Sequence, residues 1–316
     1  MRSKLFFLLS LTVLIISSCS KKADDSNGEA ESSVSVAEAG VSEVGSQTTS
    51  TEGGVSVGTS SVKDQDLAFQ EMDYLDQPGQ QRSLAPLSIC LFTTHRSTCT
   101  SNVSTIDWDG CTIGTATMSG GWSETWTAGF CADGSRPGVL TNNTNVVRTS
   151  SLQTLTFKSG ASIETDTAAH TAWDGTAIPA TGVKVAAAVS GSVTTRTVTI
   201  YGLHRVIKGT QGQRLADHSI TSSGLTVTGT RATADRTVSG SLNLYHNLAN
   251  YTATQTFTAV KWGSASCCYP TSGTISSNFS GSVTGTTLLT FTTTCGAATF
   301  QGSDGVSTSV ALSQCH

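Results

Sequence analysis

From residue 86 onward, threonine, valine, serine and glycine alternate with a period of two, and this alternation constrains the fold most. Residues 196–203 (RTVTIYGL), for example, place Val198 and Ile200 on one face of a strand and Leu203 on the other. The same alternation predicts strands at residues 152–158, 225–230, 237–245, 251–262, 286–294 and 307–312. Apolar faces of this kind pack into a core, whereas threonine suits the wet face of a sheet.

Short turns separate the predicted strands and decide how they pair. Asp-Gly pairs mark four of the turns, at residues 109–110, 133–134, 174–175 and 304–305. Short strands joined by short turns form antiparallel meanders, because parallel strands need long crossovers. We therefore expect an all-β domain over residues 86–316, built as a β-sandwich, a rolled open sheet or a small barrel. It forms either one unit or two that divide near residue 146.

The N-terminus carries an export signal. Arg2 and Lys4 precede an apolar run over residues 5–16, which is too short for a bilayer span and is typical of a signal peptide. The run ends in Ile16-Ser17-Ser18-Cys19, which resembles the lipobox of bacterial lipoproteins.

This resemblance implies that residues 1–18 are removed and that Cys19 becomes an acylated N-terminus. Several buried acyl chains hold a protein stably on a membrane. Ser20, which follows the cysteine, favours the outer membrane or cell surface over inner-membrane retention in that family. We expect no cofactor besides this covalent lipid.

The segment behind the lipid is predicted to be an acidic tether. Residues 19–64 are rich in serine, glycine, glutamate and alanine and lack aromatic residues, so they cannot bury enough surface to fold. Residues 65–85 differ, because Leu67, Phe69 and Met72 fall near helical spacing; we expect a short helix there.

Eight of the nine cysteines fall in the predicted β domain. They form two groups of four: Cys90, Cys99, Cys111 and Cys131, then Cys267, Cys268, Cys295 and Cys315. An even number in an exported chain predicts disulfides, and no CxxC spacing favours a metal site instead. In the first group we favour the pairs Cys90–Cys99 and Cys111–Cys131. In the second, Cys267 and Cys268 point to opposite faces of a strand, so we expect each to reach a different partner.

Composition and motifs argue against several functions. Charged residues are 13% of the chain, about half the usual share, and there is no basic surplus for a nucleic-acid partner. Known catalytic and nucleotide-binding motifs are absent from the sequence. The six histidines are scattered, and carboxylates lie close in sequence only as the candidate pairs Asp107/Asp109 and Glu164/Asp166. We therefore predict no catalytic residue and no metal ligand.

Three tryptophans, Trp108, Trp122 and Trp126, lie between Cys99 and Cys131. On an exposed strand face they would stack on sugar rings. Because Trp122 and Trp126 fall on the same side of a strand, packing in the core is the favoured alternative.

These patterns predict a lipid-anchored envelope or cell-surface protein. The favoured role is non-enzymatic binding or adhesion, with the membrane contacted through the lipid and a glycan or protein as ligand. A purely structural envelope protein is the alternative. A hydrolase of unrecognised type is a third hypothesis, and a cluster of histidines and acids in space would be needed to support it.

Overall fold

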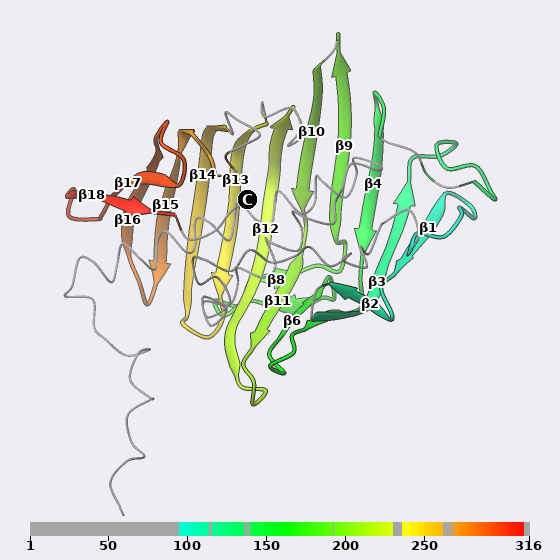
Figure 1. Ribbon diagram of the computed structural model, residues 1–316, viewed down its shortest axis with the longest axis horizontal. Coiled ribbons are helices and arrows are strands. Elements are labelled where there is room, and N and C mark those ends of the chain that lie inside the picture. The colour runs from blue at the N-terminus through cyan, green and yellow to red at the C-terminus, as the bar shows by residue number, and fades with distance from the viewer. Residues whose placement is uncertain are drawn as a thin grey trace, which may run out of the picture.

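The computed structural model describes residues 95–312, apart from residues 114–115, 136, 138–139, 192, 230–235, 262–266 and 268. The expected signal peptide (1–18), Cys19 with its linker (19–64) and the helix (65–85) lie outside the described residues, as do Cys90, Cys268 and Cys315. Within this part the chain is all-β, as predicted (Figure 1). No helix in it is long and apolar enough to cross a bilayer.

The strands are β1 (Val103–Asp107), β2 (Cys111–Ile113), β3 (Ala116–Trp126), β4 (Thr144–Thr149), β5 (Gln153–Thr156), β6 (Ser162–Asp166), β7 (His170–Thr171), β8 (Ala177–Ile178), β9 (Val183–Ser190), β10 (Val193–Ile200), β11 (Leu203–Lys208), β12 (Arg214–Thr228), β13 (Thr237–His246), β14 (Tyr251–Lys261), β15 (Ser272–Gly281), β16 (Gly285–Phe291), β17 (Ala297–Gln301) and β18 (Ser307–Ala311). Sixteen of them form one antiparallel sheet, and β7 pairs with β8 alone. Of the architectures expected, the chain therefore adopts the open sheet.

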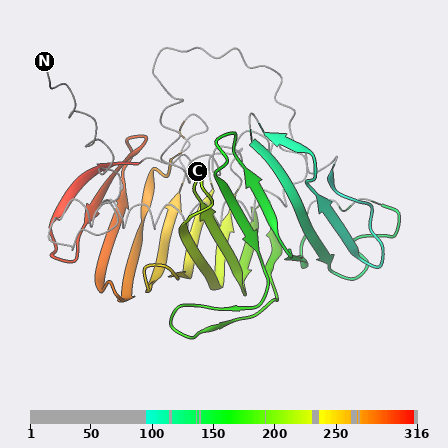
Figure 2. The ribbon, with the colours of Figure 1, turned by 90° about the horizontal axis from the view of Figure 1, so that it is seen from below.

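The sheet is largely a meander, but it forks between β3 and β12. β3 pairs with β5 along its first half and with β4 along its second half. Likewise, β12 pairs first with β11 and then with β10. Two branches, β4–β9–β10 and β5–β6–β11, therefore run side by side between β3 and β12, and β13 to β18 continue as a simple row (Figures 1 and 2). Residue 146 lies within β4, inside this sheet.

One face of the sheet, the core face, carries the apolar side chains. Val146, Val185, Val198 and Leu225 align in one row across four neighbouring strands, and all are 0% exposed. Full burial of a side chain of this size stabilises a fold by about 1.5–3 kcal/mol.

The opposite face, the polar face, carries the threonines. On β14, Thr254, Thr256 and Thr258 are exposed, whereas Phe257 on the core face is buried. The alternation predicted for residues 251–262 is thus confirmed over residues 253–258, whereas Thr252 is buried and residue 262 lies outside the described residues.

The prediction of one strand over residues 196–203 was wrong. The segment divides into β10, which ends at Ile200, and β11, which begins at Leu203. Tyr201 leaves the ladder, and its amide donates to the carbonyl oxygen of Gly182 at 3.0 Å. Because this break shifts the alternation, Leu203 returns to the core face and is 0% exposed.

The core face also holds a buried ion-paired group. Glu124 is 0% exposed and lies between Arg96, whose Nε is 2.8 Å from Oε2, and Arg148, whose Nε is 3.1 Å from Oε1. The hydroxyl of Ser104 donates to the same carboxylate. These partners satisfy a charge that would otherwise be costly to bury.

Two disulfides confirm the oxidised cysteines and correct their pairing. Cys99 bonds to Cys131, with Cα atoms 5.7 Å apart, so the favoured pairs Cys90–Cys99 and Cys111–Cys131 were wrong. The backbone bridge between Cys99 and Asp133 brings these segments together. Cys267 bonds to Cys295, one of the two partners expected for it, and Cys111 is disulfide-bonded as well.

Candidate functional site

The tryptophans considered for ligand stacking lie mainly in the core. Trp108 and Trp126 are buried, at 5% and 4% exposure, and Trp122 is partly buried against the same apolar clusters. The indole of Trp126 donates to Ser104 Oγ at 2.9 Å and stacks on Phe130. Trp108 and Trp126 therefore pack the sheet and offer no open ring to a ligand.

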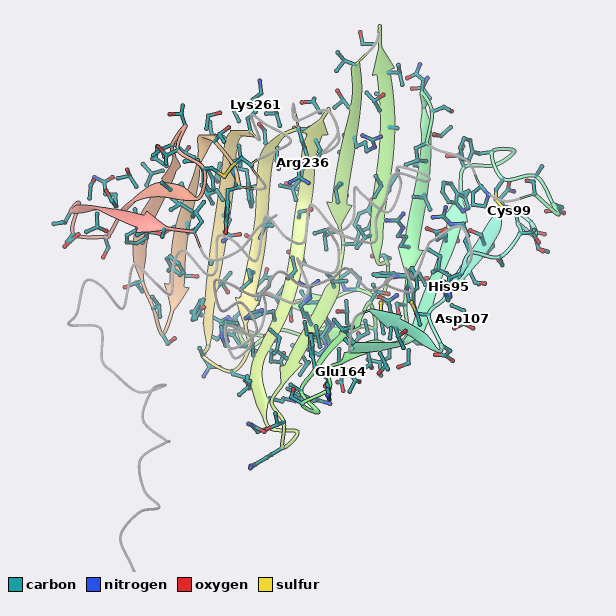
Figure 3. The ribbon with its side chains drawn as sticks, in the orientation of Figure 1. His95, Cys99, Asp107, Glu164, Arg236 and Lys261 are labelled. Atoms are coloured by element: carbon teal, nitrogen blue, oxygen red, sulfur yellow. A yellow bond between two sulfur atoms is a disulfide. The ribbon has the colours of Figure 1, made fainter. Side chains whose placement is uncertain are left out.

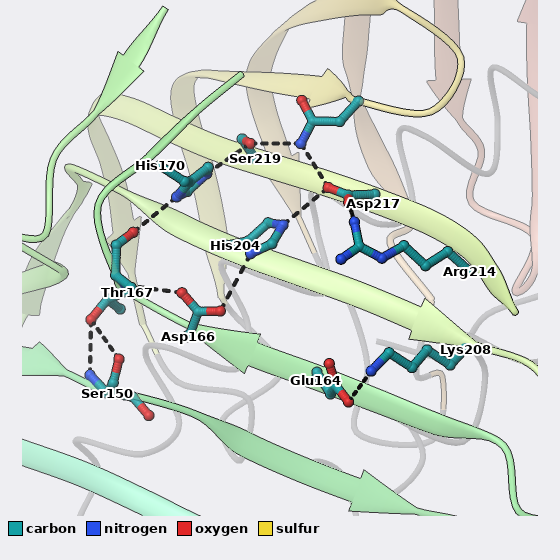
Figure 4. Close-up of polar contacts among 12 residues, drawn as sticks. Ser150, Glu164, Asp166, Thr167, His170, His204, Lys208, Arg214, Asp217 and Ser219 are labelled. Carbon is teal, nitrogen blue, oxygen red and sulfur yellow. Dashed lines mark hydrogen bonds and ion pairs between the residues drawn. The ribbon is translucent and has the colours of Figure 1, made fainter. Parts of the chain in front are cut away.

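The two candidate carboxylate pairs have different surroundings. Asp107 accepts a hydrogen bond from the backbone amide of Asp109 in the turn, and Asp109 accepts one from the amide of Gly120 on the adjacent β3, so both carboxylates support the backbone at this turn. Glu164 and Asp166 share the polar face of β6, as their spacing predicted. Glu164, which Figure 3 places in the lower part of the sheet, pairs with Lys208 on the neighbouring β11 (Figure 4).

Asp166 belongs to a cluster of charged side chains on the polar face of β6, β11 and β12. His204 lies between two carboxylates, with Nδ1 3.3 Å from Asp166 Oδ2 and Nε2 3.0 Å from Asp217 Oδ1 (Figure 4). Both ring nitrogens of His204 therefore face carboxylate oxygens, which accept hydrogen bonds.

Asp217 is the most highly connected member of this cluster. Its carboxylate accepts from Asn247 Nδ2 and Arg214 Nη1, each at 2.7 Å, besides His204. Burial alone raises the pKa of Asp217, but the hydrogen bonds from Asn247 and His204, with the charges of His204 and Arg214, lower it below its ordinary value. The carboxylate is therefore held ionised.

A loop of residues 167–182, here called the cover loop, lies over this part of the polar face. It contains β7 and β8. His170 Nδ1 donates to the carbonyl oxygen of Ala168 at 2.9 Å, and Nε2 lies 2.8 Å from the hydroxyl oxygen of Ser219 (Figure 4). The rings of His170 and His204 lie 4.6 Å apart.

A serine and a histidine in contact are the parts of a nucleophilic site, but Ser219 is 0% exposed. Its Oγ also accepts from Asn247 Nδ2 at 2.9 Å. In this geometry the pair fastens the cover loop to β12 and gives a substrate no path to the hydroxyl.

Two glycines let the cover loop lie close to the sheet. A Cβ on Gly202 would lie 2.4 Å from the carbonyl oxygen of Pro179, and one on Gly281 would lie 2.6 Å from the ring of Trp173. The indole of Trp173 donates to Thr252 Oγ1 at 3.0 Å. The loop is thus packed against strands from β11 to β15.

Beside the cover loop, the polar face is hollowed where the sheet forks. β11 pairs with β12 only as far as Ile220, and β10 pairs from Leu225 onward, so the stretch between them has no strand partner on that side. The bulge at Ser223 falls in this stretch. The resulting hollow of about 320 Å³ is lined by Ile200, Tyr201, Thr221, Ser222, Ser223, Ser241, Leu242 and Asn243.

Besides the aliphatic Ile200 and Leu242, the groups that line the hollow are hydroxyls, one amide and one aromatic ring. Tyr201, which is 41% exposed, stands next to the break between β10 and β11. Thr221, Ser241 and Asn243 are partly exposed. A ring beside several neutral hydrogen-bonding groups is suited to a hydroxylated, uncharged ligand.

Sequence reasoning did not single out Asp217, Asn247, Tyr201 or Asn243. Asp217 and Asn247 meet across 30 residues, and Tyr201 and Asn243 line one hollow only because the sheet forks. The Tyr201-Gly202 pair inside an alternating segment was the one local sign of a break.

Within the described residues, no group of three histidine, cysteine or acidic side chains is placed to hold a metal ion. Comparison of the chain with protein-family models, curated proteins and solved structures gives no match.

Proposed function

We propose that this protein is a lipid-anchored envelope or cell-surface module that binds a glycan at the hollow beside Tyr201. The observation that carries the proposal is the hollow itself, where an exposed tyrosine ring adjoins the side chains of Thr221, Ser241 and Asn243. Its volume lies at the lower end of the range for small-ligand sites. Sugars present apolar ring faces and many hydroxyls, and these two features match the ring and the neutral polar groups.

The placement on the envelope is supported by the export signal and by the disulfides. The lipobox-like Ile16-Ser17-Ser18-Cys19 supplies the anchor, and the Cys99–Cys131 and Cys267–Cys295 bonds suit an oxidising compartment. On this proposal the membrane is contacted through the acylated Cys19 and the ligand through the sheet.

A glycan array, followed by titration calorimetry on the strongest hit, tests the binding proposal. Tyr201→Ala should weaken binding about tenfold or more because the ring is lost, while Tyr201→Phe should retain most of the affinity. Val306→Ala, an exposed change in the turn before β18, serves as the control. If the protein binds no glycan, or if Tyr201→Ala binds as tightly as the wild type, the proposal is wrong and the purely structural role is favoured.

The anchor is tested separately by Cys19→Ala and metabolic labelling with a fatty acid. The wild-type protein should incorporate label and fractionate with membranes, and the variant should do neither. Labelling of the variant equal to that of the wild type would contradict the lipid attachment.

A further inference from the structure

A row of amide and hydroxyl side chains leads from the hollow across four strands of the polar face. The register aligns Asn243 on β13, Thr254 on β14, Asn278 on β15 and Thr286 on β16. Asn243 is shared with the lining of the hollow, so the row begins where the hollow ends.

The threonines orient the two amides. Thr254 Oγ1 donates to Asn243 Oδ1 at 2.9 Å, and Thr286 Oγ1 donates to Asn278 Oδ1 at 3.3 Å. With the amide oxygens engaged, neither Nδ2 group bonds to another described residue. The row therefore presents two oriented donor groups at the surface.

The spacing of these two donor groups matches the repeat length of one class of polysaccharide. Asn243 and Asn278 are separated by one strand, and two strand spacings amount to about 9.6 Å. In an extended β-1,4-linked polysaccharide, successive sugars are turned over, so the same hydroxyl faces the same side once per disaccharide. That repeat is comparable to the separation of the two amides, whereas α-1,4-linked chains coil.

The low charge of this surface also limits the class of ligand that it can bind. Within the strands β13 to β18 themselves, Lys261 is the only described lysine, arginine, aspartate or glutamate, and it lies at the end of β14 (Figure 3); Asp304 lies in the turn between β17 and β18. A surface without charged side chains cannot form ion pairs with a charged polymer. The hydroxyl groups of a neutral polymer, in contrast, can form hydrogen bonds with its amide and hydroxyl side chains.

We infer that the site binds an uncharged, extended β-1,4-linked polysaccharide that lies across β13 to β16, with one end in the hollow against Tyr201. This inference rests on the glycan-binding function proposed above. Asn243 and Asn278 each donate to the ligand, one disaccharide apart, and Tyr201 stacks on a terminal ring.

Calorimetric titration of the full chain with β-1,4-linked N-acetylglucosamine oligomers of two, four and six sugars tests the inference. Affinity should rise from the dimer to the tetramer and then change little, because the row ends at Thr286. Asn278→Ala should weaken tetramer binding about three- to tenfold, the value of one or two hydrogen bonds, and leave dimer binding unchanged. Thr258→Val, on the same face of β14 but outside the row, is the matched control and should match the wild type.

The outcomes separate the two proposals. If the dimer binds and Tyr201→Ala removes binding, but the tetramer binds no better and Asn278→Ala has no effect, the extended site is wrong and the hollow stands. Tighter binding of β-1,4-linked mannuronate oligomers, which are anionic but share the linkage, than of the neutral oligomers would overturn the assignment to an uncharged ligand. If neither neutral nor anionic oligomers bind, this inference is overturned, and the glycan array decides the broader proposal.

Discussion

The polar face of the sheet divides into two halves that use side chains in opposite ways. Over β6, β11 and the start of β12, it carries Asp166, His204 and Asp217, and the cover loop lies on top. Over β13 to β16, beyond the contacts that Trp173 of the cover loop makes at Thr252 and Gly281, it carries the partly exposed Asn243 and the exposed Thr254 and Asn278. The first half is charged and lies under the cover loop, and the second is neutral and largely exposed.

The difference shows how one antiparallel surface can both fasten a loop and display a site. Asp217 accepts from Asn247, whose Oδ1 in turn accepts from the backbone amide of Trp173 in the cover loop. The partly buried charge of Asp217 therefore helps to hold the loop in place, because hydrogen bonds to ionised groups are strong and directional. Neutral amides and hydroxyls remain solvated at little cost and can exchange water for a ligand. We therefore expect substitutions in the charged half to change stability and those in the neutral half to change binding.

The largest effect is expected for Asp217→Ala. Without this carboxylate, His204 keeps only Asp166 as a partner and faces a cavity on its other side, and Asn247 loses one hydrogen-bond acceptor. We expect a loss of about 2–4 kcal/mol in the free energy of unfolding, measured by urea denaturation. Asp304→Ala, an exposed turn aspartate, is the control. An equal loss for the two variants would mean that the cluster has no special role.

Acidification should destabilise the protein in two steps, one from each face of β12. On the core face, desolvation together with the charges of His246 and Arg205 lowers the pKa of His218 to about 3. The unfolded chain binds this proton below about pH 6.5 and the folded chain does not, so stability is full above that pH and falls as the pH drops.

Asp217 adds a second loss on the polar face, beginning below about pH 4, because its folded pKa lies below the unfolded value. Each group contributes at most about 1.4 kcal/mol per pH unit. Urea denaturation at pH 7, 5.5, 4 and 3 measures both steps. His218→Gln should flatten the curve between pH 6.5 and 4, and Asp217→Asn should flatten it below pH 4. An unchanged curve in either variant would assign that step to other groups.

The smallest effect on stability is expected for Thr254→Val in the neutral half. Valine suits a strand as well as threonine does, and the side chain is exposed, so the free energy of unfolding should change by less than about 0.5 kcal/mol. Thermal unfolding measures it. A loss as large as that of Asp217→Ala would remove the distinction between the halves.

Periodicity alone predicted much of the fold, because alternation is a local property of the backbone. The strand at residues 251–262, its wet threonine face and the glycines of the Asp-Gly turns all follow from the pleat and from positive φ angles, such as 78° at Gly110. The same reasoning failed at residues 196–203. There the break depends on Gly182, a residue distant in sequence.

The sequence by itself determined an antiparallel β chain with one apolar and one polar face, rich in disulfides. Only the tertiary structure decided that these strands form a single forked sheet, that Cys99 bonds to Cys131, and that Asp217 meets Asn247. The reason is physical: side-chain alternation is written residue by residue, whereas strand order and pairing depend on contacts between segments far apart in the chain.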